Sequence, residues 1–301
     1  MKVLITGGLG FVGTQLSVRL LEKGHQVTVV DHSPEPRDDT PEEAIYVSGD
    51  TAVQGAWQEE IADQDAVINL AGASIFTRWN DETKKLIHNS RILTTRNVVE
   101  AMPKETVKLL CSTSAVGYYG FRGDEKLTEE DAPGDDFLAS LAVDWENEAR
   151  KAEDKGVRVA ITRFGIVVGK TGGALGQMIP AFKKFVGGPL GSGNQWFSWI
   201  HMEDLLNAFM FVLDNEDIKG PVNFCSPNPV RNRDLAKALG RVLRRPSFLT
   251  TPGFMLRLVL GEFGLVLLEG QRVVPAKLAK HGYAFRYPDI TAALEQVVKE
   301  D

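Results

Sequence analysis

The chain has 301 residues, of which 43% are hydrophobic and 25% are charged. This ordinary globular composition excludes a disordered chain, a collagen-like repeat and a coiled coil. Its 34 lysine and arginine residues stand against 40 aspartate and glutamate residues, which gives a formal net charge of −6. We therefore expect no nucleic-acid partner and no binding to anionic membranes.

The sequence contains no sign of a disulfide framework, a metal site or a membrane span. Cys111 and Cys225 lie far apart in apolar stretches, which indicates buried, reduced thiols. No Cys/His spacing is typical of a metal site. The most apolar segment, residues 254–268, contains two charged residues and predicts a buried or lobe-packing helix. Residues 1–5 run directly into a glycine turn and leave no room for a signal peptide, so we expect a cytoplasmic protein.

Short apolar strands alternate with longer helical patterns in the first half of the chain. The strands are expected at residues 3–5, 27–30, 44–47, 66–70, 107–112 and 157–162. The helices between them are expected at residues 11–23, 56–61, 82–101 and 138–155. Strands joined by crossovers of this length pair in parallel. The pattern therefore predicts a doubly wound parallel α/β sheet.

The second half of the chain is less regular. The alternation stops near residue 163, and a glycine-rich stretch follows. A strand is expected at 223–225, a helix at 232–243, and an amphipathic helix that carries Ile290, Leu294, Val297 and Val298 at the end. These elements predict a smaller second lobe.

Gly7, Gly10 and Gly13 form a G-x-x-G-x-x-G turn between the first strand and the first helix, with Phe11 and Val12 inside it. Glycine lets the backbone bend sharply and lets a pyrophosphate approach the main chain. The first turn of the helix offers free N–H groups and a positive dipole end. Any tight strand–helix turn also favours glycine, but the surrounding pattern favours a dinucleotide site.

Asp31 ends the second strand, eighteen residues after Gly13, where an acid accepts hydrogen bonds from the adenosine ribose of NAD. The alternative is a solvated acid or a helix cap. A carboxylate repels the 2′-phosphate of NADP, so we expect NAD to be preferred. His32 and Arg37 lie close enough in sequence to favour NADP instead.

The spacing of this turn resembles that of the extended short-chain dehydrogenase/reductase superfamily, which includes the NAD-dependent epimerases and dehydratases. The resemblance continues through Gly49-Asp50, Asn69-Leu70-Ala71-Gly72, Ser112-Thr113-Ser114-Ala115, Arg163-Phe164-Gly165-Ile166 and Ile200-His201-x-x-Asp204-Leu205. It implies a Rossmann-like fold and cofactor contacts from Asp50, Leu70, Ala71, Gly72, Ser112 and Ile166.

Other residues resemble an atypical branch whose members are called epimerase family proteins. They are Arg78-Trp79-Asn80, Ser90-Arg91, Trp145-Glu146, Gly191-Ser192-Gly193 and Leu267-Leu268-Glu269-Gly270-Gln271. The branch has a characteristic carboxy-terminal region, here about residues 247–298. Either arginine could clamp a phosphate or a carboxylate. We assign Arg78 to the cofactor, and for Arg91 a plain surface charge is an equal alternative.

We expect a cofactor domain at residues 1–165, which also receives residues 196–215. The smaller substrate lobe then covers residues 166–301. The protein is expected to be a monomer or a homodimer without a metal ion.

The catalytic residues of the superfamily are not complete. Its Tyr-x-x-x-Lys pair lies on one helix face, with tyrosine as the general acid/base. This chain has Leu141 and Trp145 at those positions and no such pair elsewhere. The following residue, Glu146, is expected on a solvated helix face, with a site carboxylate as the alternative.

Three protic residues remain near the expected site. Ser114 aligns with the superfamily serine that hydrogen-bonds the substrate oxygen. Tyr118 and Tyr119 follow it and are candidate acids, although they are equally suited to pack over the nicotinamide. The resemblance thus implies an NAD(P)-dependent oxidoreductase or epimerase for a small carbonyl or hydroxyl compound or a nucleotide-sugar-like substrate. The alternative is a non-catalytic NAD(P)-binding or redox-sensing protein.

Overall fold

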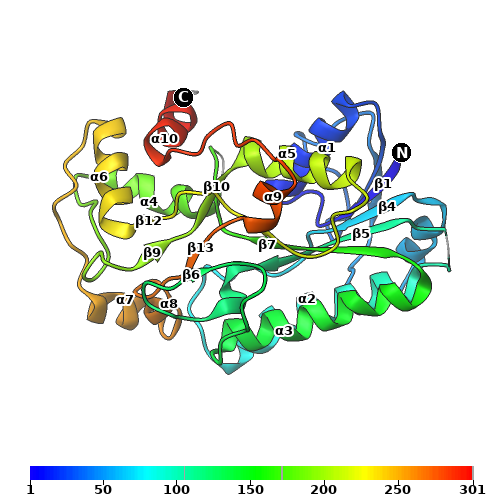
Figure 1. Ribbon diagram of the computed structural model, residues 1–301, viewed down its shortest axis with the longest axis horizontal. Coiled ribbons are helices and arrows are strands. Elements are labelled where there is room, and N and C mark those ends of the chain that lie inside the picture. The colour runs from blue at the N-terminus through cyan, green and yellow to red at the C-terminus, as the bar shows by residue number, and fades with distance from the viewer. Residues whose placement is uncertain (105, 171, 300–301) are drawn as a thin grey trace.

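A seven-stranded parallel sheet lies at the centre of the computed structural model, which describes residues 1–104, 106–170 and 172–299 (Figure 1). Its strands are β1 (Lys2–Thr6), β2 (Gln26–Asp31), β3 (Ile45–Ser48), β4 (Ala66–Asn69), β5 (Leu109–Ala115), β7 (Arg158–Phe164) and β11 (Gly220–Phe224). The order is β11-β7-β5-β4-β1-β2-β3. The order reverses between β1 and β4, which is where ligands bind in doubly wound sheets.

Helices cover both faces of this sheet. In Figure 1, α2 (Asp81–Ala101) and α3 (Phe137–Arg150) lie on one face, and α1 (Phe11–Glu22) and α5 (Met202–Asp214) on the other. Along β1, Val3 and Ile5 belong to the core beneath α1 and α5, whereas Leu4 belongs to the core beneath α2 and α3. Because successive side chains of a strand point to opposite faces, a strand covered on both sides is apolar throughout. The predicted doubly wound sheet is confirmed.

Three details of the predicted elements differ from the structure. The strand expected at 223–225 is β11, which pairs with β7 in the central sheet. The segment expected as a helix at 56–61 is the 3₁₀ helix η1 (Ala56–Asp63), a form common in short segments. The helix expected to reach residue 155 changes into the 3₁₀ helix η3 (Lys151–Lys155) after α3 and ends at Gly156, whose φ is +81°.

A second group of elements lies beyond the carboxyl ends of these strands. β8 (Ile166–Val168) pairs with β10 (Trp199–His201), and β9 (Trp196–Phe197) pairs with β12 (Val230–Arg231). These strands share a core with α4 (Gly173–Lys183), α6 (Asn232–Leu243) and α10 (Ile290–Lys299). β6 (Lys126–Leu127) and β13 (Arg272–Val273) form a further pair, followed by α9 (Ala276–Lys280). The domain boundary near residue 165 stays a prediction.

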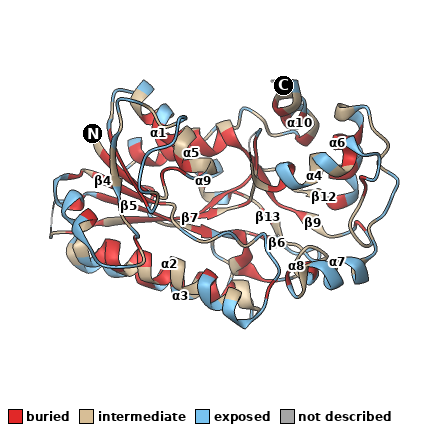
Figure 2. Ribbon diagram, turned by 180° about the vertical axis from the view of Figure 1, so that it is seen from behind, coloured by how far each residue is buried: buried red, intermediate tan, exposed pale blue. Residues whose placement is uncertain are grey.

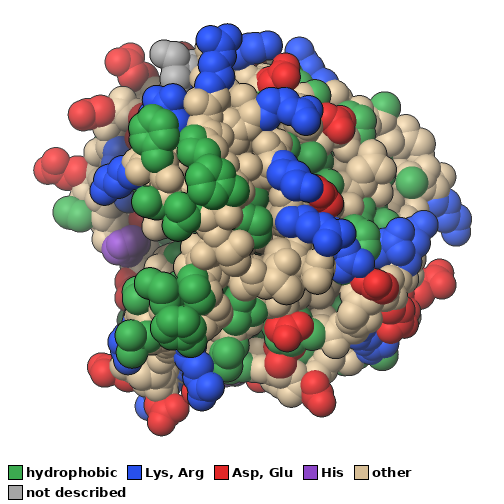
Figure 3. All heavy atoms as spheres, turned by 90° about the vertical axis from the view of Figure 1, so that its left-hand side faces the viewer, with side chains coloured by type: hydrophobic (Ala, Val, Ile, Leu, Met, Phe, Trp, Pro, Cys, Tyr) green, Lys and Arg blue, Asp and Glu red, His purple; other side chains and the backbone are tan. Residues whose placement is uncertain are grey.

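The single helix expected at residues 254–268, either buried or packed on a lobe, does not form as one element. The segment forms α7 (Gly253–Leu260) and α8 (Phe263–Val266), which are separated at Gly261 with a φ of +63°. None of the α7 residues is buried, as the pale blue and tan ribbon of this helix shows (Figure 2). Phe263 of α8, by contrast, packs on Trp79. Apolar side chains gather on this end of the molecule (Figure 3). Phe254 and Leu258 of α7 are 73% and 72% exposed.

Two other sequence predictions concern the cysteines and membrane spans. Cys111 and Cys225 are both buried free thiols, as expected. Among the described residues, every helix is too short or too polar to cross a membrane.

Candidate functional site

The glycine turn joins β1 to α1 in a conformation that side chains would obstruct. Gly7 has a φ of +68° and donates its N–H to the Val30 carbonyl at 2.8 Å. A Cβ on Gly13 would lie 2.5 Å from the Gly7 carbonyl oxygen, so the helix could not approach the strand as closely. A Cβ on Gly10 would meet only that same oxygen, at 3.1 Å. The remaining space around Gly10 is therefore open, so a ligand can approach its backbone.

The first turn of α1 is suited to an anion. No side chain caps the helix at Gly10, and its first turn contains no acidic residue. The turn therefore offers N–H groups and the positive end of the helix dipole without a competing carboxylate. These features fit the pyrophosphate of a dinucleotide. Val12 lies in this first turn and is partly buried.

Asp31 is fixed against the glycine turn. It is buried, and its Oδ2 accepts the Leu9 N–H at 3.1 Å. His32 lies on the solvent side, with Nδ1 2.9 Å from Asp31 Oδ1. Arg37 donates to the Leu9 carbonyl at 3.0 Å. Asp31 and Arg37 therefore both bond to Leu9 of the turn, and His32 contacts the acid from the solvent side.

Two loops border the turn. Gly7 lies against Ala71, because a Cβ on Gly7 would come within 2.9 Å of Ala71 backbone atoms. Leu70, Ala71 and Gly72 follow β4, which pairs with β1. On the other side, the Phe11 ring fills the space beside Gly169, Gly172 and Gly173, at the start of α4. The structure thus brings the predicted residues 7–13, 31–32 and 70–72 together.

The other predicted cofactor residues are less closely tied to the turn. Asp50 is exposed and accepts the Ala52 N–H at 3.0 Å. Ile166 is partly buried in β8. Ser112 is buried in β5, and its hydroxyl has no hydrogen-bond partner in the described chain. Arg78 is exposed and donates to the Leu258 carbonyl of α7 at 3.1 Å, so it contacts the carboxy-terminal region. Their roles stay predictions.

Ser114 belongs to a buried ionic network. Its hydroxyl donates to Glu146 Oε1 at 2.8 Å. The same carboxylate accepts Nε and Nη2 of Arg163 at 2.7 and 2.8 Å. All three side chains are buried, so the expectation of a solvated Glu146 is wrong. Arg163 lies on the apolar strand β7, where its charge requires a carboxylate partner.

The two tyrosines both contact Arg163, and their rings also contact each other edge to face. Tyr119 donates to Asn223 Oδ1 at 2.7 Å and accepts from Arg163 Nη1 at 2.9 Å. Burial raises the pKa of Tyr119 well above its usual value, so this hydroxyl stays neutral. The Tyr118 ring lies 3.4 Å from the Arg163 guanidinium carbon. The Tyr118 hydroxyl forms no hydrogen bond within the described chain, and this residue is only partly buried.

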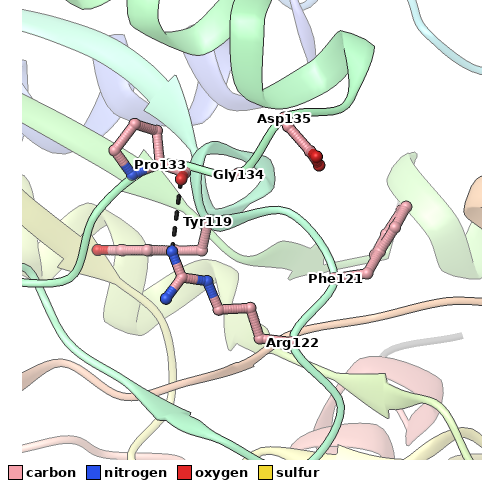
Figure 4. A pocket seen from close by; sticks show the side chains of 6 residues that line it. All are labelled: Tyr119, Phe121, Arg122, Pro133, Gly134 and Asp135. Atoms are coloured by element: carbon pink, nitrogen blue, oxygen red, sulfur yellow. Dashed lines mark hydrogen bonds between the residues drawn. The ribbon is translucent and has the colours of Figure 1, made fainter.

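A hollow of about 330 Å³ lies beside these tyrosines. Its lining residues are Tyr119, Phe121, Arg122, Pro133, Gly134 and Asp135 (Figure 4). The Tyr119 hydroxyl points away from Phe121 and Asp135, and Arg122 donates to the Ala132 and Pro133 carbonyls. No glycine-turn residue lines the hollow. It therefore gives no direct support to a substrate site at the nicotinamide end.

A second polar network fixes Trp145. Its indole N–H donates to Thr95 Oγ1 at 2.8 Å, and Thr95 also accepts from Asn69 Nδ2 at 2.9 Å. Asn69 in turn accepts from Thr6 at 2.6 Å. Trp145 is therefore held by residues of β1, β4 and α2, and it has no acid/base function of its own.

Arg91 lies over this tryptophan, with its guanidinium carbon 5.2 Å from the ring centroid. From the sequence, an anion clamp and a surface charge are equal alternatives for Arg91. A useful signal was its spacing of four residues from both Ile87 and Thr95, which are buried and place Arg91 on the inward side of α2. Within the described residues, no cluster of His, Cys, Asp and Glu could hold a metal ion.

Comparison with known proteins finds similar sequences and a similar fold. Residues 3–225 match the model of the NAD dependent epimerase/dehydratase family, and residues 251–297 match a domain of unknown function, DUF1731. An Arabidopsis thaliana protein named Epimerase family protein SDR39U1 homolog, chloroplastic, is 42% identical over 99% of this chain and 87% of its own length. Epimerase family protein YfhF of Bacillus subtilis is 39% identical over 100% of this chain and 99% of its own.

A solved structure is similar over the whole chain. The human epimerase family protein SDR39U1 (isoform2), crystallised with NADPH, has a TM-score of 0.89 and is 33% identical to this chain. The comparison covers 100% of both chains.

Proposed function

Because this chain belongs to the NAD-dependent epimerase/dehydratase family, we propose that it is an NAD(P)-dependent oxidoreductase or epimerase. Its substrate is a small carbonyl or hydroxyl compound or a nucleotide-sugar-like molecule. The observation that carries this proposal is the glycine turn, with its uncapped helix start and with Asp31 against Leu9. When bound, the nicotinamide supplies hydride transfer to or from a carbon that bears oxygen.

Ser114 orients the substrate oxygen in this proposal. A hydroxyl has one proton, and that of Ser114 is directed to Glu146. The Ser114 oxygen is therefore ready to accept a hydrogen bond from a substrate hydroxyl, which suits oxidation of an alcohol. To donate to a carbonyl, Ser114 must first rotate away from Glu146.

Tyr118 is the general acid/base that exchanges a proton with the substrate oxygen in this proposal. Tyr119 is committed to Arg163 and Asn223, whereas the Tyr118 hydroxyl is free of partners in the described chain. The ring of Tyr118 lies against the Arg163 guanidinium, which holds it beside the buried network of Ser114. We therefore prefer Tyr118 as the acid/base group.

NAD is the preferred cofactor in our proposal. Asp31 retains acceptor capacity for ribose hydroxyls beyond its bond to Leu9. His32 and Arg37 lie beside it and reduce the repulsion of a 2′-phosphate, and the human relative was crystallised with NADPH. The two dinucleotides must therefore be compared directly.

A second function is favoured by the absence of Tyr-x-x-x-Lys and by the enclosed Ser114 and Tyr119. It is non-catalytic NAD(P) binding or redox sensing, which needs the glycine turn and no acid/base group. The cytoplasm as the compartment and a monomer or homodimer as the assembly also stay predictions.

Titration with NADH and NADPH, followed by turnover assays, tests both functions. We expect binding of a dinucleotide and slow cofactor oxidation with at least one small carbonyl or nucleotide sugar. Binding without turnover across a broad panel would support the sensor. Absence of binding would remove both functions.

A further inference from the structure

Most of the exposed large hydrophobic residues lie at one end of the molecule. Among the described residues sixteen such side chains are exposed, and nine of them lie between residues 185 and 265. They occupy positions 185–186, 248–249, 254–255, 258–259 and 265, which we call the apolar patch. Figure 3 shows apolar side chains on this end, with lysine and arginine side chains beside them. Contiguous apolar surface on a folded protein marks a contact with a protein or a membrane.

The parts of the apolar patch belong to one continuous surface. Residues 185–186 follow α4, and a Cβ on the nearby Gly188 would lie 2.2 Å from the Leu249 carbonyl oxygen. Two residues further, Thr251 donates its N–H to the Pro189 carbonyl at 2.9 Å. α7 begins two residues after this contact. The end of α4, the loop that contains Leu249 and the start of α7 therefore lie side by side.

α7 is apolar around its whole circumference. Its sequence is Gly-Phe-Met-Leu-Arg-Leu-Val-Leu, in which Arg257 is the one charged residue. Leu260, at its end, packs on the small core around Trp79, but none of the α7 residues is buried. A helix that is apolar on all sides is normally enclosed by protein or by lipid. Because the protein leaves the outer side of α7 open, this side needs another apolar environment to cover it.

The segments that carry the apolar patch are positively charged, although the whole chain has a net charge of −6. Residues 173–202 and 235–261 contain seven lysine and arginine residues and no aspartate or glutamate. Two exposed lysines, at residues 183–184, directly precede the patch. The Arg245 guanidinium carbon lies 4.7 Å from the centroid of the Phe185 ring. The expectation of no binding to anionic membranes follows from the total charge, whereas this end of the molecule has the opposite local charge.

The charge and the exposure of the patch distinguish between its possible occupants. In a two-fold symmetric dimer the patch would face its own copy, so that like charges would meet. A groove that receives a peptide helix encloses its lining residues, whereas Phe248, Phe254 and Leu258 are 79%, 73% and 72% exposed and therefore protrude. Protruding apolar side chains among lysines and arginines are suited to a bilayer. There they reach the acyl boundary while the cations stay at the headgroups.

We propose that the apolar patch docks this protein on a phospholipid membrane with anionic headgroups, with α7 in the plane of the interface. The proposal concerns where the protein binds and not what it converts. It is therefore independent of the proposed function, and its test involves no dinucleotide.

Co-sedimentation with vesicles tests the proposal. The full chain is mixed with vesicles of phosphatidylcholine alone and with vesicles of phosphatidylcholine and phosphatidylglycerol in equal amounts. We expect binding to the mixed vesicles that weakens at high salt, and little binding to the neutral vesicles. Melting temperatures show whether each variant is folded.

Two kinds of variant separate the apolar from the electrostatic contribution. Phe254→Ser and Leu258→Ser each remove one inserted side chain, which should weaken binding to the mixed vesicles by roughly 10- to 150-fold. Lys183→Gln combined with Lys184→Gln should weaken it by roughly fivefold for each lysine, because each charge is attracted to the anionic surface.

The matched controls lie on α2, outside the patch. Leu86 is 60% exposed, and Lys85 beside it is also exposed. Leu86→Ser and Lys85→Gln make the same chemical changes as the test variants. Vesicle binding by both controls should therefore equal that of the wild type.

The proposal is overturned if the wild type does not bind the mixed vesicles, or if folded Phe254→Ser and Leu258→Ser bind them as the wild type does. Equal binding to neutral and mixed vesicles would contradict the choice of anionic headgroups. Sedimentation velocity without lipid identifies the competing occupant. A dimer that Phe254→Ser abolishes would assign the patch to a second copy of this chain and overturn the membrane as its partner.

Discussion

The two sides of the site are built by different means. At the glycine turn the backbone does the positioning, through the φ of Gly7 and the close approach of Gly13 to Gly7. Around Ser114 the positioning comes from side chains, because Glu146 and Arg163 form a bidentate buried pair to which the serine is attached. A backbone site accepts any ligand with the right shape, whereas a side-chain network fixes where each proton lies. The first is suited to a cofactor shared by many enzymes, and the second to one particular reaction.

The largest effect is expected from breaking the buried pair. Arg163→Met removes the bidentate partner of the buried Glu146 and leaves it only Arg150, 3.6 Å from Oε2, which should destabilise the protein by about 3 kcal/mol. The measurement is the free energy of unfolding in urea. Lys299→Gln serves as the control, because it removes a solvent-exposed pair with Glu295 and should change stability by less than about 1 kcal/mol. Equal stability of the two variants would show that the network is not essential to the fold.

Ser114→Ala tests the substrate side of the site without removing a charge. If hydride chemistry occurs, turnover should fall on the order of a hundredfold, while the dissociation constant of the cofactor stays the same. The measurement is single-turnover oxidation of bound NADH with a responsive carbonyl substrate. Normal turnover would exclude Ser114 from the mechanism and leave Tyr118 as the residue to examine.

Gly13→Ala tests the backbone side. The added methyl would lie 2.5 Å from the Gly7 oxygen, so α1 must move and its N–H groups shift away from the phosphates. Loss of one such hydrogen bond to a charged group predicts an affinity for NADH lower by roughly 10- to 150-fold. Gly176→Ala is the matched control, since Gly176 lies in α4 with no atom near its added methyl. Unchanged binding in a folded Gly13→Ala would contradict the assignment of the turn.

The smallest effect concerns the choice of dinucleotide. We expect NADH to bind more tightly than NADPH, and Asp31→Asn to reduce the ratio of the two dissociation constants by about tenfold, or 1.4 kcal/mol. Both constants are measured by fluorescence at one ionic strength. Tighter NADPH binding by the wild type would mean that His32 and Arg37 outweigh the carboxylate.

The sequence predicted the sheet well because its strands obey strong local rules. Val3, Leu4 and Ile5 make β1 apolar on both faces of the sheet, and the turn after this strand requires glycine. The site was predicted less completely. Arg163 on an apolar strand signals a buried carboxylate, but nothing local identifies Glu146 as that partner. Their contact joins β7 to α3, and it depends on how the helix is rotated about its axis.

The error at α7 has a related cause. The leucines and phenylalanines of residues 254–268 predict a single buried or lobe-packing helix, yet Gly261 ends α7 early, and α8 packs on Trp79. A hydrophobic segment is buried only if another part of the chain packs over it. That condition depends on the tertiary path and cannot be read from the segment itself.

The position of β11 beside β7 restricts how this molecule can be made and rebuilt. The chain leaves the sheet after β7, passes through β8, α4, β10 and α5, and returns as the outermost strand. During synthesis, β7 has no outer neighbour until residue 224 has left the ribosome, so a shorter nascent chain exposes an unpaired edge. Exchanging the second lobe in an engineered protein therefore requires replacing the segment between β7 and β11 as well as the segment that follows β11.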